Sequence, residues 1–109
     1  MDDKVMTTDN FIAYVDIDLK EIIPGFLENR QQDVKQLQLA TKQNDIKSLG
    51  NIAHNLKGIG SSYGFEAITQ LGISIGESLQ ANDMEHINAD IERLSHYLAN
   101  VKIFYQQAD

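Results

Sequence analysis

Residues 87–105 read INADIERLSHYLANVKIFY, and their apolar side chains recur in alternating steps of four and three. The positions are Ile87, Ile91, Leu94, Leu98, Val101 and Tyr105. An α-helix has 3.6 residues per turn, so this spacing places all of them on one face. A seam of this kind suits packing against nearly antiparallel helices. The stretch therefore predicts a long amphipathic helix that belongs to a bundle.

Three more segments towards the N-terminus have the same helical spacing of apolar residues. The first follows Pro24, which suits the first turn of a helix because its fixed backbone angle is already helical. Gln43-Asn44-Asp45 interrupts it, and Asn44 or Asp45 can cap the next segment, which starts at Ile46. Ser61-Ser62-Tyr63-Gly64 is typical of a turn, in which Gly64 adopts a left-handed conformation. The last of the three is expected from Phe65 to about Ala81.

Together these segments predict an all-α fold: an antiparallel, up-down-up-down four-helix bundle with a short additional N-terminal helix near Asp16. Residues 1–15 are expected to form an N-terminal arm, and residues 16–109 the bundle. A chain of 109 residues is long enough for one small core, so a single domain is expected.

The composition excludes several classes of function. Sixteen acidic residues against nine basic ones give a formal charge of -7, which argues against a grip on the phosphates of DNA or RNA. The chain has no cysteine, so it has neither disulfides nor thiolate metal sites. We expect no basic-then-apolar leader, and no apolar run in the sequence approaches the roughly 18 residues of a membrane span. We expect a soluble, cytoplasmic protein that binds no membrane.

His54 stands out within the second of these helices. Residues three, four and seven apart share a helix face, so its nearest neighbours are Gly50, Lys57, Gly58 and Ser61. Each glycine inside a helix costs roughly 1 kcal/mol relative to alanine, so such a strip of small residues needs a reason. Helices tolerate it where a partner or another backbone must come close. His54 is the group that such a partner would reach.

The chemistry available to this face is nucleophilic. A neutral imidazole carries a lone pair near pH 7, because its unperturbed pKa is roughly 6.5. Attack on a phosphoryl group also needs the phosphoryl oxygens to be partly neutralised, and Lys57 lies one turn on with a mobile positive charge. Gly58 leaves room for the phosphoryl donor.

The string HNLKGIGSSYGF (54–65), followed by Leu71-Gly72, resembles the signature of histidine-containing phosphotransfer (HPt) domains. The similarity extends more loosely from about Ile17 to about Tyr105. This resemblance implies a monomeric four-helix bundle that relays phosphoryl groups between aspartates of receiver domains, as a carrier without kinase activity of its own. The implied partners are response-regulator receiver domains and a hybrid sensor histidine kinase.

The resemblance also implies a role for each residue of the motif. His54 would be phosphorylated on its outer ring nitrogen, Lys57 would steady the phosphoryl group, and Gly58 would let the receiver approach. No cofactor is expected on this chain, since the Mg²⁺ of such reactions belongs to the receiver. Some members of the family orient the histidine with a Gln or Glu on the following helix. That position falls on Gly76 here, and neither Gln70 nor Glu77 matches it.

Docking of a receiver is expected on the second and third long helices. The candidate contact residues are Gly50, Ile59, Ser61, Tyr63 and Phe65. Gly72 and Gly76 are interpreted instead as residues that permit a tight helix crossing.

Three alternatives stay open. The chain resembles in part the dimerisation domain of a sensor kinase, but Asn55 follows the histidine where an acidic residue is typical, and no proline ends the motif. A helical bundle that binds partners without chemistry has the same composition. His86 with Asp90, and Glu92 with His96, have the spacing to hold a metal, although solvated pairs at this spacing are far commoner.

Overall fold

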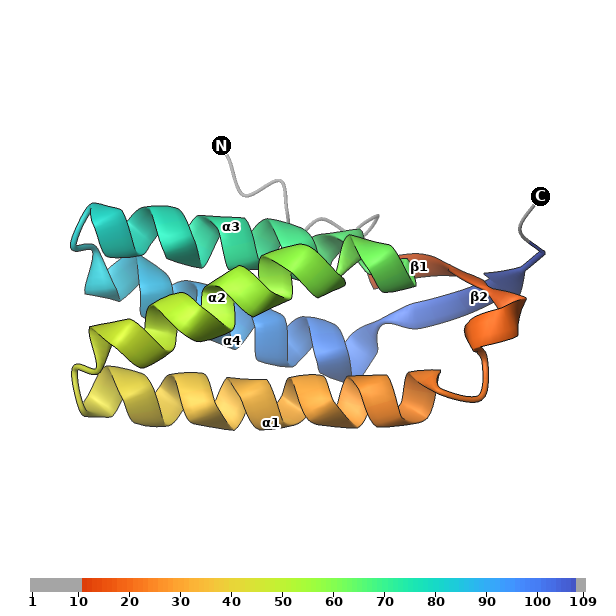
Figure 1. The fold of residues 1–109 in the computed structure, drawn as a ribbon, viewed down its shortest axis with the longest axis horizontal. Helices are drawn as coiled ribbons and strands as arrows, with labels where there is room; N and C mark the ends of the chain where they lie inside the picture. The colour runs from red at the N-terminus through yellow and green to blue at the C-terminus, as the bar shows by residue number, and fades with distance from the viewer. Residues whose placement is uncertain (1–10, 108–109) are drawn as a thin grey trace.

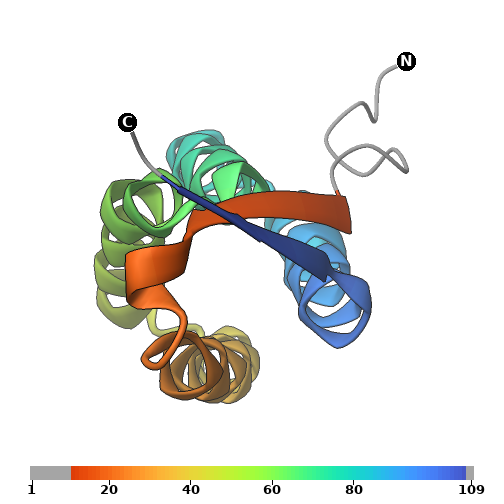
Figure 2. The ribbon, with the colours of Figure 1, turned by 90° about the vertical axis from the view of Figure 1, so that its right-hand side faces the viewer.

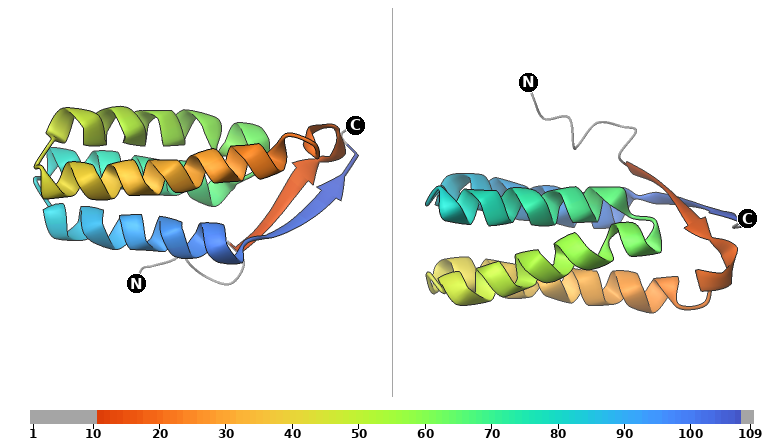
Figure 3. Two further views of the ribbon diagram at one scale, coloured as in Figure 1. Left: turned by 90° about the horizontal axis from the view of Figure 1, so that it is seen from below. Right: turned by 45° about the horizontal axis from the view of Figure 1, so that its top comes forward.

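The computed structural model describes residues 11–107, which form four α-helices and two short strands (Figure 1). The helices are α1 (Ile23–Lys42), α2 (Ile46–Ile59), α3 (Glu66–Gln80) and α4 (Met84–Asn100). Each helix runs back along its predecessor, and α2 packs beside both α1 and α3, as α4 does (Figure 2 and Figure 3). The prediction of a four-helix, mostly helical chain is confirmed.

The turns that precede α2 and α4 are built in the same way. Asn44 and Asn82 have positive φ angles, 55° and 56°, which end the preceding helix in a left-handed turn. The next residue is an aspartate that caps the following helix: the Asp45 carboxylate accepts the Ser48 amide N–H at 3.1 Å, and Asp83 caps α4 alike. The expected cap at Asp45 is confirmed, as is Pro24 in the first turn of α1.

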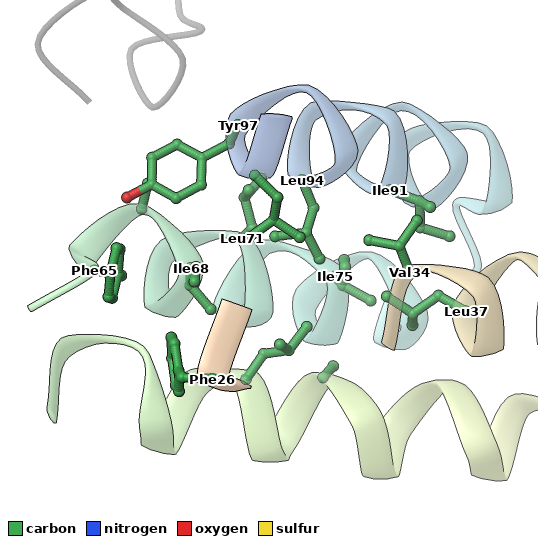
Figure 4. Packing of buried hydrophobic residues seen from close by; sticks show 14 of the residues in the cluster. Phe26, Val34, Leu37, Phe65, Ile68, Leu71, Ile75, Ile91, Leu94 and Tyr97 are labelled. Carbon is green, nitrogen blue, oxygen red and sulfur yellow. The ribbon is translucent and has the colours of Figure 1, made fainter. Parts of the chain in front are cut away.

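The core lies between the four helices and is almost entirely apolar. Figure 4 shows Leu71 and Ile75 of α3 facing Leu94 and Ile91 of α4. Tyr97 is also fully buried, and burial raises the pKa of its phenol. The side chains that are fully buried are Tyr97, Phe65, Ile23, Leu37, Leu49, Leu56, Ile68, Leu71, Ile75, Ile87, Leu94 and Val15.

Helices α2 and α3 cross in close contact at Gly72. A Cβ atom on Gly72 would lie 2.6 Å from the backbone nitrogen of Lys57 and 2.8 Å from the backbone oxygen of Ala53. Only glycine permits this approach. The interpretation of Gly72 as a crossing residue is confirmed.

The expectation of an all-α chain is wrong at its two ends. Strands β1 (Ile12–Asp16) and β2 (Lys102–Gln106) form a parallel pair, with Ile12 opposite Lys102. The pair lies across one end of the bundle (Figure 2). On β1, Ala13 and Val15 are buried in the core, so this part of the expected N-terminal arm is integral to the fold. Residues 1–10 of that arm lie outside the described residues.

The helix expected to reach Tyr105 ends at Asn100. Val101 has an extended backbone, with φ −66° and ψ 135°. Beyond it, exposed and half-buried side chains alternate with the period of two that is typical of a strand. The β-branched and aromatic residues of β2 suit a pleated surface, and pairing with β1 decides the conformation.

The short N-terminal helix expected near Asp16 takes a smaller form. A single 3-10 turn, η3 (Ile17–Leu19), follows β1. Asp16 begins this turn, since its carboxylate accepts the amide N–H of Asp18 at 2.9 Å. Within residues 11–107, no helix combines the length and the apolar character needed to cross a membrane.

Candidate functional site

His54 lies on the exposed face of α2 and borders a groove between α2 and α3. The groove has a volume of about 630 Å³. It is lined by Gly50, Ala53, His54, Lys57, Gly72, Ile73, Gly76, Glu77 and Gln80. The imidazole is therefore open to solvent and can be approached by another molecule.

Lys57 lines the same groove, one turn after His54, and its side chain is also exposed. In the described part of the chain, hydrogen bonds to a histidine ring are formed at His86 and His96, and none at His54. The structure thus brings together a solvent-exposed nucleophile and a cation, as the spacing predicts.

The glycines around His54 fall into two kinds. A Cβ atom on Gly58 or Gly76 would meet nothing within 4 Å, and one on Gly50 would only touch Leu79 at 3.9 Å. The interpretation of Gly76 as a crossing residue is therefore wrong, because the groove beside His54 lies where its side chain would be. Gly72 alone of these four makes the helix contact. Gly50, Gly58 and Gly76 leave the surface beside the imidazole free of side chains of their own.

No side chain takes the place of Gly76 above the imidazole. Gln70 points elsewhere, since its amide donates to the Glu66 carboxylate at 3.2 Å. Glu77 and Gln80 do line the groove, and they are the polar groups of α3 nearest to this face. The ring is thus left without a fixed partner within residues 11–107.

The charge around His54 differs from that of the rest of the chain. Between Ile46 and Phe65 there are two lysines, Lys47 and Lys57, and no acidic residue, although the chain carries 16 acidic residues in total. Helix α2 is therefore a locally positive element in an acidic protein. A negatively charged group approaching His54 is attracted by Lys57 and repelled by Glu77 of α3, which lines the same groove.

A second groove, about 590 Å³ in volume, lies on the other side of α2, against α1. Ile59 and Tyr63 border it, and its floor is Phe26, whose ring stacks on Tyr63 at a centroid distance of 4.4 Å. Ile22, half of whose surface is exposed, forms part of the rim. Asn55, the residue that directly follows His54, also lines this groove.

The structure separates the five candidate docking residues. Gly50 lines the first groove, Ile59 and Tyr63 line the second, and Ser61 is exposed beyond the end of α2. Phe65 is fully buried and stacks on Phe26, so the prediction that it contacts a docked receiver is wrong. The helical pattern alone could not tell Phe65 from an exposed aromatic residue, because it precedes α3 and its side chain direction depends on the turn.

His86 and Asp90, considered above as metal ligands, belong to a clamp between α3 and α4. Asp90 is buried, and its carboxylate accepts hydrogen bonds from the Ser74 hydroxyl at 2.5 Å and from Arg93 Nη1 at 2.9 Å. His86 Nε2 lies 3.5 Å from the same carboxylate. Ser74 and Arg93 satisfy this buried charge, and the cluster ties the two helices together.

Several residues near the site are not apparent from the sequence. Thr69 is buried against the end of α2, and Ile73, Gln80 and Ile22 line the two grooves. They reach the site through the packing of α1 and α3 on α2. The spacing of Thr69 and Ile73 from Gly72 and Gly76, on the same helix, is the only local signal for their place.

Comparison with known families agrees with this geometry. The family model of the Hpt domain matches residues 21–103, which include all four helices. Comparison with curated proteins and with solved structures found no match. Domains of this family are histidine phosphotransfer modules of phosphorelays, which interact with receiver domains and histidine kinases. The chain belongs to the Hpt domain family.

Proposed function

We propose that His54 is the phosphoryl carrier of this domain, accepting the group from an aspartate of one receiver domain and passing it to another. The observation that carries the proposal is the exposed imidazole in a groove that it shares with Lys57. A nucleophile with this task must be reached by a folded partner, and the open surface at Gly58 and Gly76 permits that approach.

The transfer step uses the lone pair of Nε2. This nitrogen forms an N–P bond while the P–O bond to the donor aspartate breaks, and the electron pair of that bond leaves on the carboxylate oxygen. The ring keeps its proton on Nδ1. Transfer to the second receiver reverses these steps. The first step needs a neutral ring, because Nε2 attacks with its lone pair, as neutral imidazole can near pH 7. In the second step the aspartate of the receiver attacks phosphorus, and the electron pair of the N–P bond returns to Nε2.

Lys57 stabilises the transferred group. Its ammonium is a compact, mobile charge that can follow the phosphoryl oxygens from the donor to His54. We expect Lys57→Ala to slow transfer by a few-fold to about 10²-fold, the low end for loss of an electrostatic stabiliser. A Mg²⁺ ion held by the receiver would neutralise the phosphoryl oxygens on the receiver's side.

The receiver docks over α2 and the two grooves that flank it. The groove against α1 offers an apolar floor at Phe26 and an exposed rim at Ile22, next to the residue that follows His54. A contact of this kind is transient, and we expect it to bury about 1,200 Å² or less. The local positive charge of α2 complements the acidic groups that surround a receiver's phosphorylated aspartate.

The test is phosphoryl transfer from a panel of phosphorylated receiver domains to the wild type and to His54→Gln. We expect acid-labile label on His54 of the wild type and none on the variant. His96→Gln is the matched control, because His96 is an exposed histidine on α4. Label that persists in His54→Gln would refute the assignment. A folded wild type that takes no label from any receiver would favour a binding module without chemistry.

A further inference from the structure

Thr69 of α3 occupies the point at which α2 ends. Its hydroxyl accepts the backbone N–H of Ser61 at 2.7 Å and lies 3.1 Å from the backbone oxygen of Lys57, to which it donates. In a continuing α-helix, the N–H of Ser61 would bond directly to that oxygen. The hydroxyl of Thr69 is therefore inserted into the hydrogen-bond ladder of α2, at the residue that carries the cation.

The carbonyl groups at the end of α2 are satisfied one by one. The N–H of Gly60 donates to the backbone oxygen of Leu56 at 3.1 Å. The hydroxyl of Thr69 donates to the oxygen of Lys57, and the hydroxyl of Ser62 donates to the oxygen of Gly58 at 3.2 Å. The last carbonyls of a helix have no partner within the helix and otherwise turn to water. Here, the oxygen of Lys57 depends on a side chain from the neighbouring helix.

Gly60 makes this contact possible. A Cβ atom on Gly60 would lie 2.5 Å from the backbone nitrogen of Thr69 and 2.6 Å from its hydroxyl oxygen. The threonine can reach into α2 only because that atom is missing. Thr69 is itself 8% exposed, so water competes little for its hydroxyl.

Helix α3 contacts the backbone of Lys57 at the amide nitrogen as well as at the carbonyl oxygen. Gly72, one turn after Thr69, packs so closely that a Cβ atom there would be 2.6 Å from the nitrogen of Lys57. The amide nitrogen of Lys57 is thus fixed by Gly72 and its carbonyl by Thr69. The side chain of Lys57 remains exposed and faces the groove at His54.

We infer that Thr69 is a positioning residue for phosphoryl transfer, which holds the last turn of α2 so that the ammonium of Lys57 lies beside the phosphoryl group on His54. The inference rests on the proposed function. Without the hydroxyl, the ladder opens at Ser61, and the last turn of α2 gains freedom. The ammonium then samples positions away from the groove, and its stabilisation of the transferred group declines.

The experiment compares Thr69→Val, which removes the hydroxyl at nearly equal volume, with Thr69→Ser, which keeps it. Thr41→Val is the matched control, because the Thr41 hydroxyl also donates to a backbone oxygen, that of Gln38 at 2.8 Å, at the far end of α1. With a phosphorylated receiver as donor, we expect Thr69→Val to slow labelling about 3- to 10-fold, as for loss of part of an electrostatic contact. Thr69→Ser and Thr41→Val should label at the rate of the wild type. Thr69→Ala replaces Thr69→Val if circular dichroism shows the valine variant to be unfolded.

A double-mutant cycle with Lys57→Ala separates positioning from a general structural role. If Thr69 acts through Lys57, then Thr69→Val has no further effect on the rate once Lys57 is alanine. An equal loss with and without Lys57 would overturn the inference, and so would a Thr69→Val variant that labels at the rate of the wild type.

Phosphoramidate, a small phosphoryl donor, keeps this inference distinct from the proposed function. If no receiver labels the wild type, the relay role fails, but phosphoramidate still tests the coupling between Thr69 and Lys57 in the reaction of His54. Coupling in that reaction would uphold the positioning role, and its absence would overturn it.

Discussion

Replacing Gly72 by alanine tests the packing of α2 on α3 most directly. The added methyl would lie 2.6 Å from the nitrogen of Lys57, 2.8 Å from the oxygen of Ala53 and 3.0 Å from the Cβ atom of Leu56. Ordinary contacts start at 3.4 Å, so the backbone of α2 would have to retreat by about 0.8 Å at its closest point. Two of these three atoms belong to a helix backbone, which cannot turn aside as a side chain can.

The size of the effect follows from two opposing contributions. Overpacking costs up to about 3 kcal/mol when the neighbours are rigid. Alanine regains roughly 1 kcal/mol over glycine through its better helix propensity. We therefore expect Gly72→Ala to lower the free energy of unfolding by about 2 kcal/mol. Gly76→Ala is the matched control on the same helix, because its methyl meets nothing within 4 Å, and it should raise stability by about 0.5–1 kcal/mol.

Urea denaturation followed by circular dichroism measures both variants. With a slope of about 2 kcal/mol/M, the midpoint of Gly72→Ala should fall by about 1 M urea and that of Gly76→Ala should rise slightly. A Gly72→Ala variant as stable as the wild type would refute the contact geometry. So would equal destabilisation by the two substitutions, which would mean that the two glycines have the same surroundings.

Four further predictions follow from individual contacts. Asp90→Ala should lower the free energy of unfolding by about 2–4 kcal/mol, because Ser74 and Arg93 lose a buried partner; equilibrium unfolding in urea checks this. Hydrogen bonds from Ser48 lower the pKa of Asp45 below the usual value of 3.8, so its contribution to stability is present above that pH and is lost as the pH falls further. The difference in Tm between the wild type and Asp45→Ala should therefore shrink in acid. Removal of residues 101–109 deprives β1 of its partner strand β2. It should lower the free energy of unfolding by about 2–3 kcal/mol, comparable to the burial of one valine such as Val15, while the circular dichroism signal at 222 nm persists. Ile22→Ser should weaken transfer from a receiver and leave labelling by phosphoramidate unchanged, since Ile22 lies on the rim of the groove against α1 and not at His54.

The helices, and their boundaries other than the end of α4, were predictable because they depend on local signals. Asp45 bonds to an amide three residues away, Gly64 takes its left-handed conformation within its own turn, and Pro24 acts through its own ring. The pair of His54 and Lys57 was equally predictable, since both lie on one helix.

The strand pair depends on a partner about 90 residues away, and no local pattern reveals it. Val101 and Tyr105 continue the apolar spacing of α4. In the structure, however, Val101 directly precedes β2 and Tyr105 belongs to it. A short apolar run is compatible with both periods, and the contact with β1 decides between them.

The parts of the site that join two helices were also hidden. Gly72 and Gly76 are one turn apart and look alike in the sequence, but one touches α2 and the other borders an open groove. The bond from Thr69 to Lys57 spans twelve positions and exists only after α3 has packed on α2. Such contacts depend on how α3 packs on α2, so the sequence pattern of either helix alone does not reveal them.

The pairing of β1 with β2 also bears on the order in which the molecule folds and opens. Closing a loop of about 90 residues is slow compared with forming contacts between successive helices, so the helices should assemble first. A two-stranded pair has little stability of its own and is the first part of such a fold to exchange its amide hydrogens with water. We therefore expect the amides of the strand pair to exchange before those of the helix that carries His54, although Ala13 and Val15 of β1 share the core with the helices.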